Sequence, residues 1–417
     1  MAQFESALAR AGADCGVIPP AEARAIAQVG ERAKFDAAIL ALEARDAGAL
    51  AIPFVKALTQ QVRALAPDAA RFVHFGATSQ DVMDTAIVLC LRRANARLLE
   101  LSQDLGDTLA DLARSHRETP MLARTLLQPA APVPFGWKAA MWLAPIARAV
   151  PAFRKAAADA CVLQFGGASG TLSAFGARAV AVADALAKHL ELKRRVTWHS
   201  ARDGFARLAA EAAVLAGLAA KIAGDVALLM QAEVGELAEP AASGRGGSSS
   251  MPHKRNPALS MLALEAARRT PGLAATLLNQ LASEHERGLG QWQSQWFTLR
   301  ELLCASASAL AAMLDVVRGL QVNAPAMSAN LERMKGLVFS EAVALRLSRA
   351  TADRLVAQAV REDRHLRDVM RDDKDVASAV SPSELDALFE PRRSFGAANE
   401  MIERVLADWA SARENAL

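Results

Sequence analysis

The feature that most constrains this chain is a cationic, glycine-rich segment at residues 244–257, with the sequence GRGGSSSMPHKRNP. It separates two long runs that are rich in alanine and leucine. Its three glycines and three serines make the backbone adaptable, and its lysine, two arginines and asparagine supply cationic and hydrogen-bonding groups. A chain does not need such a segment to close a fold. We therefore interpret it as a lid that carries chemistry.

The runs on either side of this lid predict helices. The chain has 417 residues, of which 52% are hydrophobic and only 5% aromatic. Alanine and leucine dominate the hydrophobic residues, which favours closely packed helices over sheets. The expected long helices cover residues 81–117, 135–160, 174–190, 204–235, 258–282 (with a break or kink at Pro271) and 297–320. We expect a loop at 124–134 and no strand of any length, so the predicted fold class is all-α.

Charge and hydropathy argue against several classes of partner. The net charge is +3, which does not favour a dedicated nucleic-acid binder. The amino-terminal sequence MAQFE lacks the basic and apolar parts of a signal peptide. The most apolar stretch, residues 207–230, contains four charged side chains, so we expect no membrane span. These features predict a cytoplasmic protein.

Metal and nucleophile motifs are absent from the sequence. The four cysteines are far apart and form no C-x-x-C pair, as expected for free thiols in a reducing compartment. No two of the seven histidines have the i, i+4 spacing of a zinc-binding helix. No G-x-S-x-G elbow appears, which argues against a serine hydrolase. We therefore expect no structural or catalytic metal.

Polar residues gather in short islands between the helices. His74, Thr78 and Ser79 share one turn, where the amides of a helix start and two hydroxyls suit a carboxylate, although hydroxyl capping of a helix explains them equally well. Gln128 in the 124–134 loop is open to the same two interpretations. The glycine-rich run at 164–171 lacks the lysine of a P-loop, and we interpret it as a tight bend.

The sequence of the lid resembles that of a known family. The string GSSSMPHKRNP at residues 247–257 resembles the signature of the fumarase/aspartase superfamily, and segments 74–85, 124–128, 166–171 and 284–296 match its other active-site segments. The resemblance covers essentially the whole chain. It implies an all-helical fold with a long central bundle, in a homotetramer whose active sites are shared between subunits. The implied domains are 1–105, 106–338 (with the lid at 243–257) and 339–417.

Enzymes of this superfamily add a proton to, or remove one from, the carbon next to a carboxylate. This chemistry implies roles for individual residues. Ser248 matches the general acid/base, and Lys254 and Asn256 match the groups that stabilise the doubly charged intermediate. A serine alkoxide would need backbone N–H groups and cations around it. The further residues expected to bind a small polycarboxylate substrate are His74, Thr78, Ser79, Gln128, His199, Ser249 and Arg287.

Within the superfamily, segments 76–81, 163–168 and 292–296 are most similar to the bacterial 3-carboxy-cis,cis-muconate cycloisomerases. Where the lyases carry a histidine after the threonine of the 124–128 segment, this chain has Leu126, which cannot protonate a leaving group. A lactonising enzyme needs no such acid, because its leaving group is already a carboxylate. We therefore expect lactonisation of 3-carboxy-cis,cis-muconate. The alternatives are an adenylosuccinate lyase-like C–N lyase and a catalytically silent homologue.

One residue departs from the cycloisomerase pattern. The resemblance implies an acidic side chain near position 295, but this chain has Gln295. The amide leaves open a related activity on another polycarboxylate.

Overall fold

The computed structural model describes residues 1–242 and 244–414, so Ser243 of the expected lid and residues 415–417 lie outside the described residues. The chain divides into two compact units. The first comprises residues 1–97, 153–212 and 271–303, and the second comprises residues 98–152, 213–270 and 304–417. The boundary between the units passes through every long helix. The three-domain division remains a prediction.

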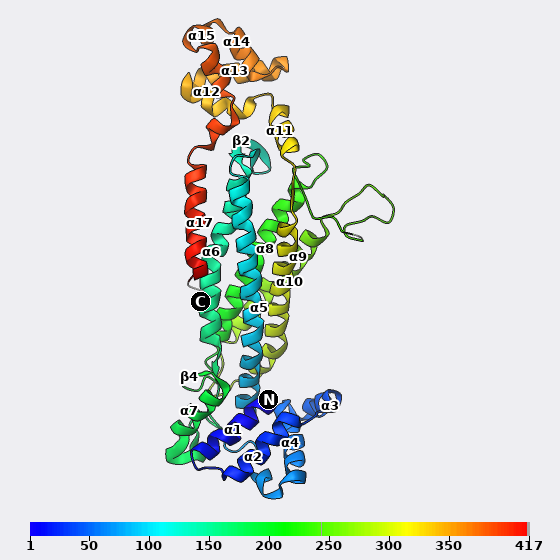
Figure 1. The fold of residues 1–417 in the computed structure, drawn as a ribbon, viewed down its shortest axis with the longest axis vertical. Coiled ribbons are helices and arrows are strands. Elements are labelled where there is room, and N and C mark those ends of the chain that lie inside the picture. The colour runs from blue at the N-terminus through cyan, green and yellow to red at the C-terminus, as the bar shows by residue number, and fades with distance from the viewer. Residues whose placement is uncertain (243, 415–417) are drawn as a thin grey trace. The chain divides into compact units, whose positions relative to one another are not determined.

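Long helices dominate the fold (Figure 1). The five longest are α5 (Ser79–Ser115), α6 (Phe135–Ala160), α8 (Asp203–Leu229), α9 (Ala258–Asn279) and α10 (Gln291–Arg318). This confirms the predicted all-α class. Helix α8 ends earlier than expected, α10 begins earlier, and α9 continues through Pro271, so this proline does not end the helix.

The first unit also contains short helices and two short strands, near the amino terminus and between the long helices. These elements are α1 (Ala2–Asp14), α2 (Pro20–Arg32), α3 (Ala37–Ala47), α4 (Ala51–Leu65), η1 (Pro67–Phe72), β3 (Val162–Leu163), η2 (Ser173–Arg178), α7 (Ala179–Leu190) and β4 (Lys193–Arg194). Apolar side chains such as Ile26, Phe54 and Leu58 form a buried core among α1, α2 and α4. This core supports the turn that leads into α5.

The second unit ends in a group of short helices with a core of its own. Its remaining elements are β1 (Pro120–Thr125), β2 (Gln128–Pro134), β5 (Leu237–Ala238), β6 (Gln321–Val322), α11 (Ala324–Arg333), η3 (Leu337–Phe339), α12 (Ser340–Arg346), α13 (Arg349–Glu362), α14 (Leu366–Asp372), α15 (Lys374–Ala379), α16 (Pro382–Leu388), η4 (Pro391–Phe395) and α17 (Ala398–Glu414). Helix α17 packs against α5, where Trp409 lies over Gly106 and donates a 2.9 Å hydrogen bond to Asp107. A side chain at Gly106 would overlap the indole ring.

The expected loop at 124–134 is wrong, because β1 and β2 form an antiparallel hairpin. Pro120 pairs with Pro134 and Thr125 with Gln128, with a two-residue turn at Leu126 and Leu127. The three prolines of β2 made a strand unexpected from the sequence, because proline has no backbone N–H to donate to a neighbouring strand. An edge strand tolerates proline, because the N–H groups on its outer side need no partner strand. The turn also lacks the Asn-Gly or Gly that usually marks a hairpin. The other strands pair over two residues each.

Two helices of the described chain, α8 and α10, are long and apolar enough by composition to cross a membrane. In their most apolar stretches, 44% and 50% of the residues are buried inside the protein. Core helices of a bundle have the same length and composition, so these two properties are weak evidence of a membrane span.

Candidate active site

A tight turn precedes α5 and carries three of the predicted substrate-binding residues. His74 and Gly76 have φ angles of 58° and 67°, which reverse the chain. Phe175 lies where a side chain at position 76 would extend, so glycine is required there for space as well as for conformation. The turn presents Thr78 and Ser79 at the amino terminus of α5, where free backbone amides favour an anion. The structure therefore places His74, Thr78 and Ser79 together, as predicted.

Asp81, in the first turn of α5, holds this region together. Its side chain is fully buried. Five donors surround its carboxylate at distances between 2.8 and 3.1 Å, namely Thr78 N, Gln164 Nε2, Gly166 N, Gly167 N and His199 Nε2. A buried carboxylate must be matched by such donors, because it has lost its hydration. The glycine-rich segment 164–171 is therefore more than a bend, since two of its amides bind Asp81.

His199 belongs to this network. Its imidazole is only 3% exposed, and Nε2 lies 2.8 Å from Asp81 Oδ1. The backbone carbonyl of His199 also accepts a 2.8 Å hydrogen bond from Gln80 Nε2. These contacts fix the position of His199 and leave little of its ring open to a ligand.

A second buried network lies one turn further along α5. Arg202 donates to both carboxylate oxygens of Asp84, at 2.7 and 3.0 Å, and Trp292 Nε1 donates to the same carboxylate at 3.0 Å. Gln295 Oε1 accepts from Arg202 at 3.0 and 2.8 Å. Gln295 therefore occupies the position where an acid was expected, and it engages the same arginine that neutralises Asp84. No feature of the helical pattern distinguished these residues as a cluster.

Arg287 lies in the exposed segment between α9 and α10. Its guanidinium donates to the carbonyl oxygen of Ala168 at 3.3 Å. Arg287 thus borders the loop whose amides bind Asp81, within the same unit as His74, Thr78 and Ser79.

In the second unit, Glu236 connects the hairpin to the start of the lid segment. Its fully buried carboxylate receives a bidentate ion pair from Arg124 of β1, at 2.7 and 2.8 Å, and a 2.7 Å hydrogen bond from Asn330 of α11. Gln128 is exposed on β2, and Leu126 at the tip of the hairpin is 97% exposed. Glu236 was not among the predicted site residues, because it lies at the end of an apolar run with no motif around it.

Lys138 of α6 is another residue that the sequence did not single out. Burial lowers the pKa of its ammonium group below the ordinary value, an effect that Asp225 and Glu236 partly offset and Lys221 and Arg124 reinforce. A lysine of lowered pKa near the hairpin is a candidate for proton transfer or anion binding. Across residues 1–242 and 244–414, no cluster of three or more His, Cys, Asp and Glu side chains could hold a metal ion.

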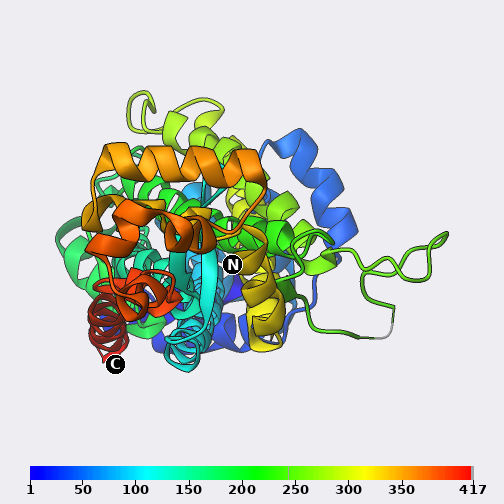
Figure 2. The same ribbon diagram turned by 90° about the horizontal axis from the view of Figure 1, so that it is seen from above.

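The lid leaves β5 and extends away from the helices of its own unit (Figures 1 and 2). Most of its side chains are exposed, Lys254 and Ser249 among them, whereas Ser248 and Asn256 are half-buried. The backbone N–H of Asn256 donates to the carbonyl oxygen of Gly246 at 2.8 Å and closes the base of the loop. The φ angle of Gly246 is 67°, and a side chain there would overlap the Asn256 carbonyl oxygen. The lid therefore brings Ser248, Ser249, Lys254 and Asn256 into one loop.

The hydroxyl of Ser248 accepts hydrogen bonds from the backbone of its own loop. Met251 N lies 3.1 Å and Ser250 N 3.4 Å from Ser248 Oγ. Donors in this position stabilise negative charge on the oxygen, as the expected role of Ser248 requires.

Glu239 anchors the lid at the point where the chain enters α9. Its carboxylate accepts from Leu259 N, Ser260 N and Ser260 Oγ at 3.1, 2.7 and 2.7 Å. These amides lie in the first turn of α9 and have no partner within the helix. Glu239 precedes the lid and α9 follows it, so one carboxylate ties both ends of the lid together.

Comparisons with known proteins show which family shares this sequence and fold. The lyase family model matches residues 1–272, and the model of the adenylosuccinate lyase C-terminus matches residues 336–405. The chain is 47% identical to the 3-carboxy-cis,cis-muconate cycloisomerase of Bradyrhizobium diazoefficiens, over 97% of this chain and 92% of that protein. The corresponding protein of Pseudomonas aeruginosa is 45% identical, over 98% and 91%.

A solved structure is similar over nearly the whole chain. The crystal structure of 3-carboxy-cis,cis-muconate lactonizing enzyme from Pseudomonas putida has a TM-score of 0.94 at 39% identity, and the match covers 99% of this chain and 94% of that one. Both the sequence and the fold are thus shared along the full length. The chain belongs to the lyase family of the fumarase/aspartase superfamily.

Proposed function

We propose that this protein is a 3-carboxy-cis,cis-muconate cycloisomerase, an intramolecular lyase that acts without a cofactor in the catabolism of aromatic acids. Similarity at 45–47% identity to proteins of that name supports the substrate class. The single observation that carries the choice within the superfamily is Leu126. It occupies the tip of the β1–β2 hairpin, where the lyases have a histidine, and it has no proton to give.

The reaction is written as an internal addition to an alkene. A carboxylate oxygen of the substrate forms a C–O bond to one alkene carbon, the π bond breaks, and the other carbon, α to a second carboxylate, takes a proton. Ser248 delivers this proton as general acid, and in the reverse direction its alkoxide removes it. Met251 N and Ser250 N are the groups that stabilise the alkoxide.

The negative charge of the intermediate builds up on the carboxylate next to the protonated carbon. Lys254 and Asn256 of the lid are the groups assigned to this charge, and Ser249 adds a hydroxyl donor. When the lid closes over the substrate, the loss of water strengthens each of these interactions.

The remaining carboxylates of the substrate need partners on the fixed part of the site. Thr78 and Ser79 supply hydroxyls beside the α5 amino terminus, and His74 and Arg287 supply cationic groups. Gln128 completes the set from the hairpin, and His199 contributes through its hold on Asp81. The superfamily pattern assembles such sites from several subunits, so we assign this enzyme to a homotetramer of the cytoplasm.

The test follows the loss of the ultraviolet absorbance of 3-carboxy-cis,cis-muconate in the presence of the purified enzyme. Adenylosuccinate and argininosuccinate are assayed in parallel. We expect turnover of the muconate alone. Turnover of an amine substrate without turnover of the muconate would support the C–N lyase alternative instead. Turnover of none of the three would favour the silent homologue.

A further inference from the structure

Glu5 in the first turn of α1 is a buried carboxylate that the proposed mechanism does not use. Its side chain is fully buried, and one residue, His74, contacts both of its oxygens. Nδ1 of the His74 ring lies 2.6 Å from Oε1, and the backbone amide of His74 donates to Oε2 at 3.0 Å. The carboxylate therefore holds the main chain and the side chain of His74 at the same time.

The backbone of His74 needs such support. Its φ angle of 58° lies in the left-handed region, which costs a residue with a Cβ roughly 1–2 kcal/mol. Residues in this region persist where the surrounding structure holds them, and they concentrate at functional sites. The next residues of this turn lead directly to Thr78 and Ser79, the predicted carboxylate-binding hydroxyls. The contact with Glu5 thus fixes the start of the anion-binding turn.

The contact also orients the imidazole ring. Because Nδ1 faces Glu5, the opposite nitrogen, Nε2, points away from that carboxylate and is free to act as a donor. Among the described residues, the hydrogen bonds of His74 to a side chain use its backbone N–H and Nδ1 and not Nε2, and 17% of the His74 side chain is exposed. The ring is therefore held at one nitrogen and open at the other.

The charges around His74 favour its protonated form. Burial alone would lower the pKa of His74, but the hydrogen bond and charge of Glu5 and the charge of Asp81 outweigh burial and raise that pKa above its ordinary value. The amino group of Met1 also interacts with the charge of Glu5. A protonated His74 carries a charge opposite to that of a carboxylate ligand.

We propose that Glu5 is a positioning residue that keeps His74 as an imidazolium with Nε2–H available to a carboxylate of the substrate. This inference rests on the proposed function and deepens it. Glu5 itself touches no substrate, and it acts through the ring and backbone of His74. The site thereby gains a cation that depends on pH, in addition to the cationic side chains of Lys254 and Arg287.

The sign of the pH effect follows from the raised pKa. Binding that uses the imidazolium is complete below about pH 6.5, the ordinary pKa of histidine, and is lost as the pH rises through the higher value that His74 has in the folded protein. The kcat/KM of the wild-type enzyme for 3-carboxy-cis,cis-muconate should therefore fall along a basic limb. Removal of Glu5 should move this limb to lower pH.

The experiment is a double-mutant cycle with Glu5→Gln, His74→Gln and the double variant. Loss of a hydrogen bond to a charged group predicts a decrease of about tenfold or more in kcat/KM for each single variant, mainly through KM. The double variant should be no slower than His74→Gln, because Glu5 acts through His74. In His74→Gln the basic limb should disappear. Effects that add in the double variant, with the limb unmoved in Glu5→Gln, would overturn the inference.

Titration of His74 by NMR separates this inference from the proposed function, because it needs no turnover. The His74 signal is identified by its absence in His74→Gln, and its midpoint should fall in Glu5→Gln whether or not the muconate is a substrate. An unchanged midpoint would overturn the inference and leave the proposed function intact. If Glu5→Gln does not fold, Glu5→Asp keeps the charge and shortens the side chain, and it should lower the same midpoint.

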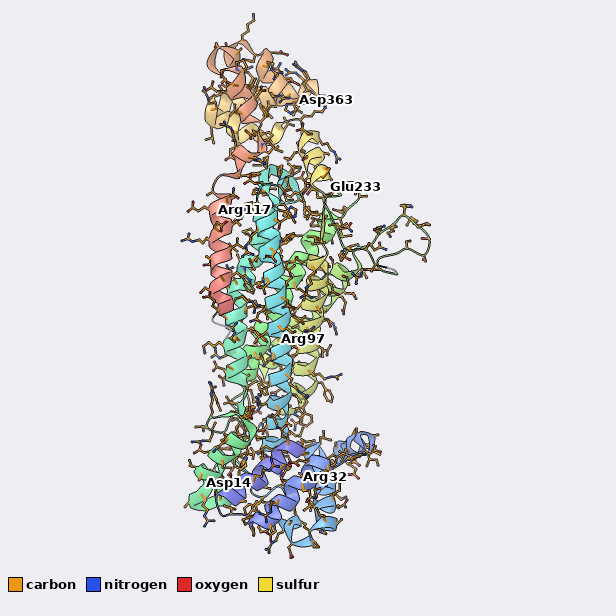
Figure 3. All side chains as sticks on the ribbon, in the orientation of Figure 1. Asp14, Arg32, Arg97, Arg117, Glu233 and Asp363 are labelled. Carbon is orange, nitrogen blue, oxygen red and sulfur yellow. The ribbon has the colours of Figure 1, made fainter. Side chains whose placement is uncertain are left out.

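The chain offers a matched control. His189 Nε2 lies 2.7 Å from the carboxylate of Asp14, the last residue of α1. Asp14 is labelled in Figure 3, and both side chains of this pair are partly exposed. His189→Gln removes a histidine–carboxylate pair of similar length that does not border the anion-binding turn. Its kcat/KM and its pH profile should match those of the wild-type enzyme. A shift of the basic limb in this control would count against His74 as its origin.

Discussion

The turn at 74–81 and the lid at 244–257 are both polar, contain glycine at a positive φ angle and are predicted to bind anions, yet they are stabilised in opposite ways. The turn is held by partners distant in sequence, because Asp81 bonds to residues 164–167 and to His199. The lid is held by local bonds, within the loop through Asn256 and Gly246 and through Ser248 and Met251, and at its base through Glu239. We propose that the two regions have different roles: the fixed turn would recognise the substrate, and the adaptable lid would bring the acid–base group.

The largest effect should come from the fixed region. Asp81→Asn replaces a buried carboxylate with an amide, which cannot match five donors, and we expect the free energy of unfolding to fall by about 3 kcal/mol. Urea unfolding measures this change. Asp36→Asn is the control, since Asp36 also accepts two backbone amides, but at the exposed start of α3, where asparagine caps a helix about as well as aspartate and the expected cost is close to zero. Equal losses in the two variants would remove the distinction between a buried anchor and an ordinary helix cap.

The lid should show the reverse behaviour, with a loss of activity but not of stability. In Ser248→Ala we expect kcat to fall by at least about a hundredfold, the scale of general acid–base catalysis, while the melting temperature stays unchanged. Ser250→Ala is the matched control, because it keeps the backbone amide that faces Ser248 and removes a hydroxyl to which no role is assigned. Near-normal activity in Ser248→Ala would move the acid–base role to another residue.

The smallest effect should come from the anchor of the lid. Glu239→Gln weakens the cap of α9, and we expect a loss of about 1 kcal/mol in the free energy of unfolding, with faster amide hydrogen exchange in the lid and in the first turn of α9. Glu233→Gln, at an exposed position labelled in Figure 3, is the control. Unchanged exchange in Glu239→Gln would mean that the lid is ordered by its internal bonds alone.

The parts that could be predicted from the sequence are those with a local signal. Alanine and leucine at helical spacing predicted most long helices, and α6 was predicted at its observed bounds. The lid and the turn at 74–79 were recognised because glycine, hydroxyl and charged residues are concentrated there. The hairpin was missed because prolines in β2 and two leucines in its turn resemble no common hairpin.

The buried networks could not be predicted, because their partners are far apart in the chain. Asp84, Arg202 and Gln295 come from three helices or helix starts, and each alone looks like a polar residue on a helix surface. Likewise, nothing near Glu5 in the sequence pointed to His74, which lies 69 positions away. Tertiary packing, not local pattern, decides which polar side chains are buried together.

Proton delivery from Ser248 to a carbon α to a carboxylate is tested most directly by the product that forms in deuterated water. With 3-carboxy-cis,cis-muconate in D₂O, NMR of the product should show a carboxymuconolactone with one deuterium on that carbon, formed at least about a hundredfold more slowly by Ser248→Ala. A lactone formed at an equal rate by Ser248→Ala would contradict the assignment of the acid. The absence of any lactone would contradict the proposed reaction itself.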